Sequence, residues 1–290
     1  MQEYDSVVRL LADARETGSI SRAVLRAQTA GSEHTEQEIY DQMAQRFAVM
    51  RQAMADGLRP GRRSPSGLSG GDAAKLHAAA GHSLCGGILA VTLARALAVA
   101  EHNACMGRIV AAPTAGSCGI LPAVVLSAGE AAGASEHAMV MSLFTAAGFG
   151  MVTAARASVS GAECGCQAEC GSASAMAAAA AVELAGGSPE MAAYAFSMAL
   201  MNELGLVCDP VAGLVEVPCI KRNASCAANA LAAAEMALAG IAADIPPDEV
   251  IDAMGAVGRM LPAALRETAA GGCAATPTGL AAAARLSGGQ

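Results

Sequence analysis

Three cysteines stand in settings that suit metal–sulfur chemistry. Cys208 and Cys219 bracket the segment CDPVAGLVEVPC, and Cys166 lies upstream among small residues in GAECGCQAECGSASAM. A residue before proline is disfavoured in the helical conformation, so we expect Asp209 and Val217 to be extended and both thiols to lie on a turn-rich loop. Free amide groups in such a loop can hydrogen-bond to cluster sulfurs. The pattern favours an iron–sulfur cluster on three protein thiolates, with one iron open to substrate.

Cys164 and Cys170 complicate the choice of ligands in the upstream stretch. With Cys166 they form a C-x-C-x3-C pattern, which is a plausible metal motif by itself. Zinc favours four ligands in a tetrahedral arrangement, and the chain has no CxxC pair to complete such a set. Burial as a small hydrophobe is the alternative for each of these thiols. We expect the isolated cysteines to lie in the core: Cys85, Cys105, Cys118, Cys226 and Cys273.

A glycine-containing turn, PTAGSCG (113–119), suits the binding of an anion. Its backbone amides around Thr114, Gly116 and Ser117 can form a concave nest for the carboxylate of a small substrate. Together with Asn103 upstream, these residues are candidates for substrate binding. A simple glycine loop is the alternative. A phosphate-binding P-loop is excluded, because no Gly-Lys-Ser/Thr follows.

Lysine is rare in this chain, with only two among the 18 Lys and Arg residues. Lys75 lies in SGLSGGDAAKLH, beside Asp72 and His77. It could bind a carboxylate, act as a base or form a Schiff base with pyridoxal phosphate. An ordinary surface lysine is the alternative. Lys221 follows Cys219 closely, so we expect its cation beside the cysteine loop and count it among the substrate-binding candidates.

Composition indicates tightly packed helices with an extensively covered surface. The 290 residues are 54% hydrophobic but only 2% aromatic, with 32 glycines, so most apolar side chains are small or aliphatic. Only 15% are charged, which is low for a monomer in water. Either a partner covers part of the surface, or the chain meets a membrane. Arg95 and Arg156 interrupt or close the most apolar stretches, which disfavours a membrane span.

Charge and cysteine content narrow the class of protein. The net charge is −8, and there is no basic cluster, so a nucleic-acid-binding role is disfavoured. The amino-terminal stretch MQEYDSVVRL is acidic and amphipathic, unlike a secretory signal. Ten cysteines without an export signal favour the reducing cytoplasm.

Start and stop signals place the helices that must position these residues. Thr35 followed by Glu38 fits a capping box, and Ser188 before Pro189 fits an N-cap with proline in the first turn. Signals of this kind, together with apolar runs, predict helices over 35–54, 86–105, 172–185, from 188 onward, and over 246–260.

The expected architecture is all-α, a single compact helical bundle with loops that carry the cluster ligands. Strand-like alternation is scarce, and IVAAPT (109–114) is its best instance. Residues 1–60 hold 16 of the charges, and we expect residues 1–58 to form an outer layer of amphipathic helices. A Pro/Gly/Arg linker (56–67) leads into a helical catalytic domain, 59–290.

Several long motifs together resemble the alpha subunit of the iron–sulfur-dependent L-serine dehydratases. Between Ser64 and Thr278 they are, in order, SGLSGGDAAKL, AAPTAGSCGILP, GCQAE, GLVCDPVAGLVEVPCIKRNA and AATPTG. The resemblance implies an oxygen-sensitive [4Fe–4S] cluster on Cys166, Cys208 and Cys219. It also implies an all-helical catalytic domain that works without pyridoxal phosphate.

The resemblance further implies a reaction and a partner. In this family the open iron acts as a Lewis acid on L-serine, a base removes the Cα proton, and hydroxide leaves. The enamine becomes an imine, which hydrolyses to pyruvate and ammonia. The family's beta subunit or domain carries a Ser-Ser-His-Thr segment near the active site, and this chain has none. We therefore expect the main base on a beta partner in a hetero- or homo-oligomer, with Lys75 the candidate in this chain.

Other readings remain open at this level. L-cysteine desulfidase resembles the same domain and expels sulfide in place of water. A non-catalytic helical protein that binds zinc or copper on C-x-C-x3-C is the alternative from another class. The ligand within 164–170 stays open, and Asp72, Asn103 and Glu216 are candidates to orient the substrate ammonium.

Overall fold

Helices account for the regular structure of the chain. The structure is a computed structural model that describes residues 4–288. These residues contain no β-strand, and their one extended pairing is an isolated bridge between Cys208 and Arg266. The all-α prediction is confirmed. The first three residues of the predicted N-terminal layer and the last two of the predicted catalytic domain lie outside the described residues.

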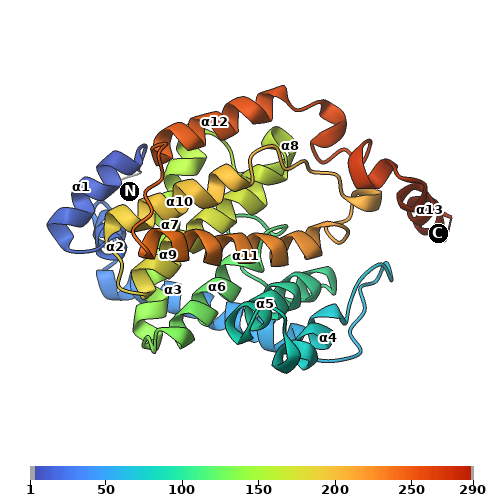
Figure 1. Ribbon diagram of the computed structural model, residues 1–290, viewed down its shortest axis with the longest axis horizontal. Coiled ribbons are helices and arrows are strands. Elements are labelled where there is room, and N and C mark those ends of the chain that lie inside the picture. The colour runs from blue at the N-terminus through green and yellow to red at the C-terminus, as the bar shows by residue number, and fades with distance from the viewer. Residues whose placement is uncertain (1–3, 289–290) are drawn as a thin grey trace.

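The elements follow one another along the chain as Figure 1 shows. The α-helices are α1 (Val7–Thr17), α2 (Ile20–Thr29), α3 (Glu36–Gly57), α4 (Asp72–Ala79), α5 (Gly87–Ala104), α6 (Ile120–Ala131), α7 (Glu136–Arg156), α8 (Gly161–Cys164), α9 (Ser172–Leu184), α10 (Pro189–Asn202), α11 (Cys219–Leu238), α12 (Pro247–Met260) and α13 (Pro277–Ser287). Short 3₁₀ turns are η1 (Ala80–His82), η3 (Val211–Gly213), η4 (Ala263–Leu265) and η5 (Gly272–Ala275), and η2 (Gln167–Gly171) is a π-helical turn.

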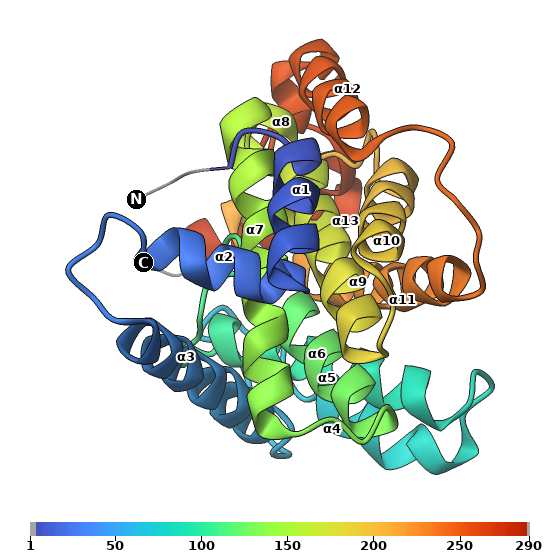
Figure 2. The same cartoon turned by 90° about the vertical axis from the view of Figure 1, so that its left-hand side faces the viewer.

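Helix α9 forms the centre of the bundle (Figure 2). Every residue from Ser172 to Val182 is buried, and the helix packs against α6, α7, α10 and α11. Most of its side chains are alanine, so neighbouring backbones approach closely. The same close backbone packing occurs where α3 crosses α5, because a Cβ on Gly57 would overlap the Ala98 carbonyl. The tight packing expected from composition is therefore present.

Helices α1, α2 and α3 form one flank of the molecule (Figure 2). Ser6, Ser19 and Thr35 cap their starts, and Thr35 makes the predicted capping box with Glu38. Helix α3 continues a little past the predicted end, to Gly57. Apolar side chains from all three helices enter the main core, among them Leu10, Val24 and Phe47.

The other predicted helices are confirmed, and the most strand-like stretch, 109–114, is not a strand. Helices α5, α9, α10 and α12 occupy the expected ranges, and Ser188 accepts from Met191 N at the start of α10. Residues 109–114 form an irregular segment between α5 and α6. The surrounding elements are helices, so no extended neighbour is there to complete a ladder.

Helix α7 is long and apolar enough to cross a membrane by length and composition alone. In the structure it packs against α9 and α2, and its buried side chains include Phe144 and Phe149. Phe149 stacks on Phe196 of α10 with ring centroids 4.7 Å apart. This is the packing of a core helix.

Candidate active site

Loops from distant parts of the chain converge around the start of α11. Figure 1 shows this helix between the α8–α12 side and the α4–α5 side of the molecule. The contributing segments are 64–72, 107–119, 160–171, 207–219 and 261–276. Side-chain hydrogen bonds that span 55 to 150 residues of sequence connect the first four.

The three predicted cluster thiols are all buried in this region. Cys166 immediately precedes the π-helical turn η2, Cys208 lies on the loop before η3, and Cys219 begins α11. Burial raises the pKa of Cys208, and a neighbouring charge at Cys166 raises it further. Burial, followed by the same charge, raises the pKa of Cys219 to about 12. The thiols therefore share one electrostatic environment.

Cys166 differs from its two neighbours in its hydrogen bonding. A hydrogen bond from Cys170 lowers its pKa, and the Arg222 guanidinium lowers it further against the opposing effect of burial. The Arg222 side chain is largely buried, pairs with Asp209 at 2.7 Å and donates to the Val207 carbonyl at 2.7 Å. A positive charge is thus held next to Cys166, which favours the anionic form of that thiol.

The C-x-C-x3-C motif is not assembled as a local metal site. Cys164 faces α12, where a Cβ on Gly258 would lie 2.6 Å from its Sγ atom. Cys170 faces Cys166 and Cys226 instead. Among residues 4–288, no three His, Cys, Asp or Glu side chains converge on one point as a single-ion site requires. The structure gives the local zinc or copper alternative no support.

The isolated cysteines divide into two groups. Cys118 and Cys226 are buried, as predicted. The prediction is wrong for Cys85 and Cys273, which are exposed, and for Cys105, which is half-buried. Each of these three lies in or beside a loop that the core does not cover.

The PTAGSCG loop is held by side chains from two directions. Thr114 donates its hydroxyl to Glu169 at 2.6 Å, and the buried Ser117 hydroxyl lies 3.4 Å from the Thr114 amide. Asn103 supports the loop from the end of α5, because it donates to the Ala115 carbonyl at 3.2 Å. The structure therefore brings Asn103, Thr114 and Ser117 together.

Asn223 of α11 connects this loop to the cysteines. Its side-chain oxygen accepts from Gly119 N at 2.8 Å, and its amide nitrogen donates to the carbonyls of Gly116 at 2.7 Å and Cys219 at 3.0 Å. The side chain is completely buried. One residue thus fixes the middle and the C-terminal end of the loop against the first turn of α11.

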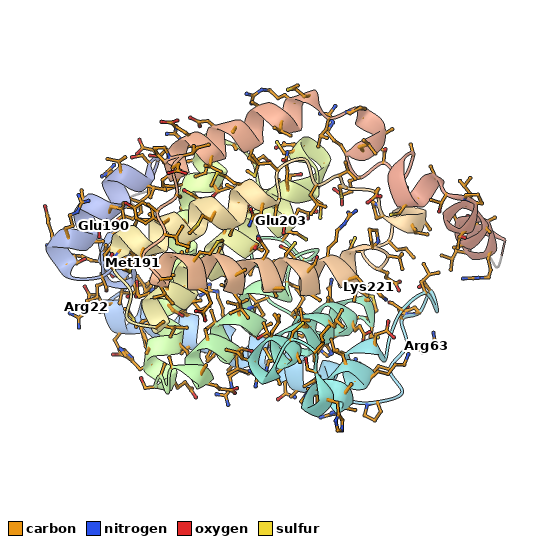
Figure 3. The ribbon with its side chains drawn as sticks, in the orientation of Figure 1. Arg22, Arg63, Glu190, Met191, Glu203 and Lys221 are labelled. Carbon is orange, nitrogen blue, oxygen red and sulfur yellow. The ribbon has the colours of Figure 1, made fainter. Side chains whose placement is uncertain are left out.

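The two lysines meet at one carboxylate. Lys75 contacts Asp72 at 3.0 Å and Lys221 contacts it at 2.9 Å, which joins α4 to α11. Figure 3 shows Lys221 at the end of α11 that faces α4 and the loop with Arg63. The hydrogen bond from Lys221, and then that from Lys75, lowers the pKa of Asp72. Both ammonium groups remain largely exposed.

Two buried carboxylates anchor the glycine-rich segment before α4. Glu101 accepts the amides of Gly71, Asp72 and Ala73 at 2.8 to 3.3 Å and so caps α4. Glu216, on the loop between Cys208 and Cys219, accepts the hydroxyls of Ser66 and Ser69.

The predicted candidates for the ammonium therefore already have protein partners. Asp72 forms ion pairs with both lysines, and Glu216 accepts hydrogen bonds from two hydroxyls. Asn103 donates to a backbone carbonyl.

Sequence reasoning missed Glu169 as a site residue. It lies on η2, half-buried, between Thr114 and Cys208, and its second oxygen is 3.9 Å from the Cys208 Sγ atom. Burial raises its pKa, and the Thr114 hydrogen bond partly opposes that shift. Its place in the GCQAE motif was the available signal. Arg222 and Asn223 lay likewise in a quoted motif, directly after Lys221.

The C-terminal segment closes over Cys208. Cys208 N donates to the Leu265 carbonyl at 2.9 Å, and Glu267 N donates to the Cys208 carbonyl at 2.8 Å. Cys273 N donates to Asp209 at 2.6 Å. Within residues 4–288, the non-glycine residues with positive φ all lie on segments around this site: Met106, Ala212, Glu267 and Ala269. Such conformations cluster at functional sites.

Comparisons with known proteins agree on one family. The family model "Serine dehydratase alpha chain" matches residues 15–274. The chain is 53% identical over 262 residues to a probable L-serine dehydratase alpha chain of Bacillus subtilis, covering 90% of this chain and 87% of that one. It is 45% identical over 258 residues to the L-serine dehydratase alpha chain of Peptoniphilus asaccharolyticus, covering 88% of each.

A longer relative shows a different chain organisation. The L-serine dehydratase of Streptomyces coelicolor is 40% identical over 277 residues, which are 93% of this chain but 60% of that one. The family model and the two alpha chains each match most of the present chain. This chain therefore belongs to the serine dehydratase alpha chain family.

Proposed function

We propose that this chain is the alpha chain of an L-serine dehydratase that converts L-serine to pyruvate and ammonia with a [4Fe–4S] cluster. The observation that carries the proposal is the meeting of three buried thiols with Glu169, Arg222 and the PTAGSCG loop, in a chain whose relatives are named L-serine dehydratases.

The donor set fits an iron–sulfur cluster. Cys166, Cys208 and Cys219 would hold it, because all three are buried, and Cys166 and Cys219 lie next to the Arg222 cation. A cubane spreads its thiolates over several irons, so they need not converge as they do around a single ion. Gly161 packs closely beside Cys208, since a Cβ there would lie 3.1 Å from Sγ. When bound, the cluster supplies an open iron as a Lewis acid toward the substrate hydroxyl.

The chain's own residues bind and orient the substrate in this proposal. The amides around Thr114, Gly116 and Ser117 receive the carboxylate, and Asn103 and Asn223 hold that loop in shape. Lys221, tied to Asp72, adds positive charge at the entrance.

The main base is assigned to a partner chain. Lys75 is the candidate here, yet it is largely exposed and paired with Asp72. The alpha-chain names of the relatives support a separate beta partner, and so does the longer Streptomyces relative. Exposed apolar side chains on elements that flank the site give such a partner a surface: Met106, Met260 and Leu280. The thiols are free, and we place the enzyme in a reducing, cytoplasmic compartment.

Anaerobic purification followed by iron and acid-labile sulfide analysis tests the proposal. We expect about four irons per chain, the content of a cubane, and pyruvate formation from L-serine that needs the beta partner and is lost in air. Cys208→Ser removes cluster and activity together. An iron-free variant that keeps its activity would overturn the mechanism.

The same preparation decides between serine and cysteine as substrate. Sulfide release from L-cysteine is compared with pyruvate release from L-serine at equal enzyme concentration. A higher kcat/KM for cysteine would redirect the assignment to a desulfidase, while zinc without labile sulfide would exclude both lyases.

A further inference from the structure

The Glu169 carboxylate keeps an oxygen without a strong partner. Glu101 binds three amides, Glu216 two hydroxyls and Asp72 two lysines, while Asp209 binds Arg222 and the Cys273 amide. In Glu169, by contrast, Oε1 accepts from Thr114, and Oε2 has only the Cys208 Sγ atom at 3.9 Å.

This contact does not satisfy a half-buried carboxylate. A thiol is a weak donor at that distance, and a thiol bound to iron has no proton to donate. Oε2 is therefore open to a stronger donor when the cluster is in place, because a hydrogen-bond partner stabilises a partly desolvated charge. Arg222 directs its two Nη atoms elsewhere, to Asp209 and to the Val207 carbonyl.

The position of Glu169 matches the shape of an amino acid. Carboxylate and ammonium sit on the same carbon, so their binding groups must be neighbours. Glu169 contacts Thr114 directly, and a Cβ on Gly116 would lie only 3.2 Å from Oε1. The carboxylate nest and this acidic oxygen are thus adjacent. On the other side Gly161 packs closely against Glu169, since a Cβ there would lie 2.5 Å from Oε2.

We propose that Glu169 binds the ammonium group of the substrate, an inference that rests on the function proposed above. The ammonium donates to Oε2 while Thr114 holds Oε1, so Glu169 selects α-amino acids over hydroxy acids that lack the amine. Fixing the ammonium also fixes the direction of the Cα–H bond toward the base.

Two ligands that differ only in the amine test this role. L-serine and 3-hydroxypropionate share the hydroxyl and the carboxylate, and only serine carries an ammonium. Binding of each is measured on anaerobic holoenzyme with its partner chain, through changes in the cluster's spectrum and through inhibition by 3-hydroxypropionate. In Glu169→Gln, the affinity for L-serine falls by about 10- to 100-fold, the worth of a charge-assisted hydrogen bond. The affinity for 3-hydroxypropionate stays within about twofold, because its groups never contact Glu169.

Controls separate this role from support of the fold. Glu163→Gln changes an exposed acid of the same stretch and leaves both affinities unchanged. Glu169→Asp keeps the charge and restores part of the serine affinity. Iron and sulfide contents remain those of wild type in all three variants.

Each other outcome decides against the inference. Equal losses for both ligands, or no loss for serine, would exclude an ammonium-binding role. Loss of iron in both Glu169 variants would assign the residue to holding the cluster instead. If the wild-type enzyme contains no iron or forms no pyruvate from L-serine, the proposed function itself is wrong, and this inference fails with it.

Discussion

Asn223 joins Cys219 to Gly116, with its side-chain nitrogen 3.0 Å from one carbonyl and 2.7 Å from the other. A single buried amide therefore sets the position of the PTAGSCG loop relative to the first turn of α11. Stability and site geometry are coupled at this residue.

Removal of that amide should cost stability as well as substrate binding. Asn223→Ala leaves the Gly119 amide and two carbonyls without partners, and we expect the free energy of unfolding to fall by about 3 kcal/mol. Urea denaturation measures the loss. Asn202→Ala, which removes one exposed side-chain bond, should cost less than about 1 kcal/mol. Similar values for the two variants would show that the Asn223 bonds are not stabilising.

The choice of ligand in the upstream stretch can be tested one cysteine at a time. Cys166→Ser should lose the cluster, whereas Cys164→Ser and Cys170→Ser should retain iron, because those thiols face Gly258 and Cys226. Iron content and the visible spectrum after anaerobic purification are the measurements. Retention of a full cluster in Cys166→Ser would contradict the ligand assignment.

Glu101 should control the order of the glycine-rich segment before α4. In Glu101→Gln the neutral amide accepts less strongly from the three backbone amides, so we expect a loss of about 1–2 kcal/mol. Hydrogen exchange at residues 70–75 should speed up relative to the rest of the chain. Unchanged protection at these residues would mean that the Ser66 and Ser69 bonds to Glu216 are enough to keep the segment ordered.

The Asp72 ion pairs predict a small acid dependence of stability. The pKa of Asp72 is lowered in the folded chain, first by Lys221, so its contribution is present above the unfolded value of about 3.9. It is lost as pH falls through the lowered pKa. Since the pair partners are exposed, the effect is below about 1 kcal/mol. Asp72→Asn should reduce the difference in unfolding free energy between pH 7 and pH 3. If that difference is unchanged, the Asp72 ion pairs do not cause the acid dependence of stability.

A methyl group at Gly161 should damage the site more than the fold. In Gly161→Ala the new Cβ would lie 2.5 Å from Glu169 Oε2 and 3.1 Å from Cys208 Sγ, so both side chains must move. We expect iron content and serine affinity to fall while the melting temperature changes little. Gly81→Ala, where the new Cβ meets nothing within 4 Å, is the matched control. Full iron content and wild-type serine affinity in Gly161→Ala would show that the site has room to adapt.

Local signals explain why the helices could be predicted. Two examples are the capping box of Thr35 with Glu38 and the helix start at Ser188–Pro189. Both involve atoms only a few residues apart, so the local sequence is enough to predict them. The strand-like alternation over 109–114 forms no strand, for the complementary reason. A strand needs a neighbour to pair with, and local alternation says nothing about whether one exists.

The fate of neighbouring cysteines depended on backbone geometry that spacing alone does not reveal. Gly165, with a φ of 74°, turns the chain between Cys164 and Cys166 and sends the first thiol toward α12. The π-helical turn then places Cys170 against Cys166, one turn further on.

The sequence by itself determined the all-α class, most of the helix starts and the family, because each rests on local propensity or on motifs that stay contiguous. Tertiary structure alone decided that Asp72, Asn103 and Glu216 are occupied by protein partners and that Glu169 faces the site with an oxygen to spare. Those contacts join residues 12 to 150 positions apart. Which of several acidic residues keeps a free oxygen is settled only when the whole chain has packed.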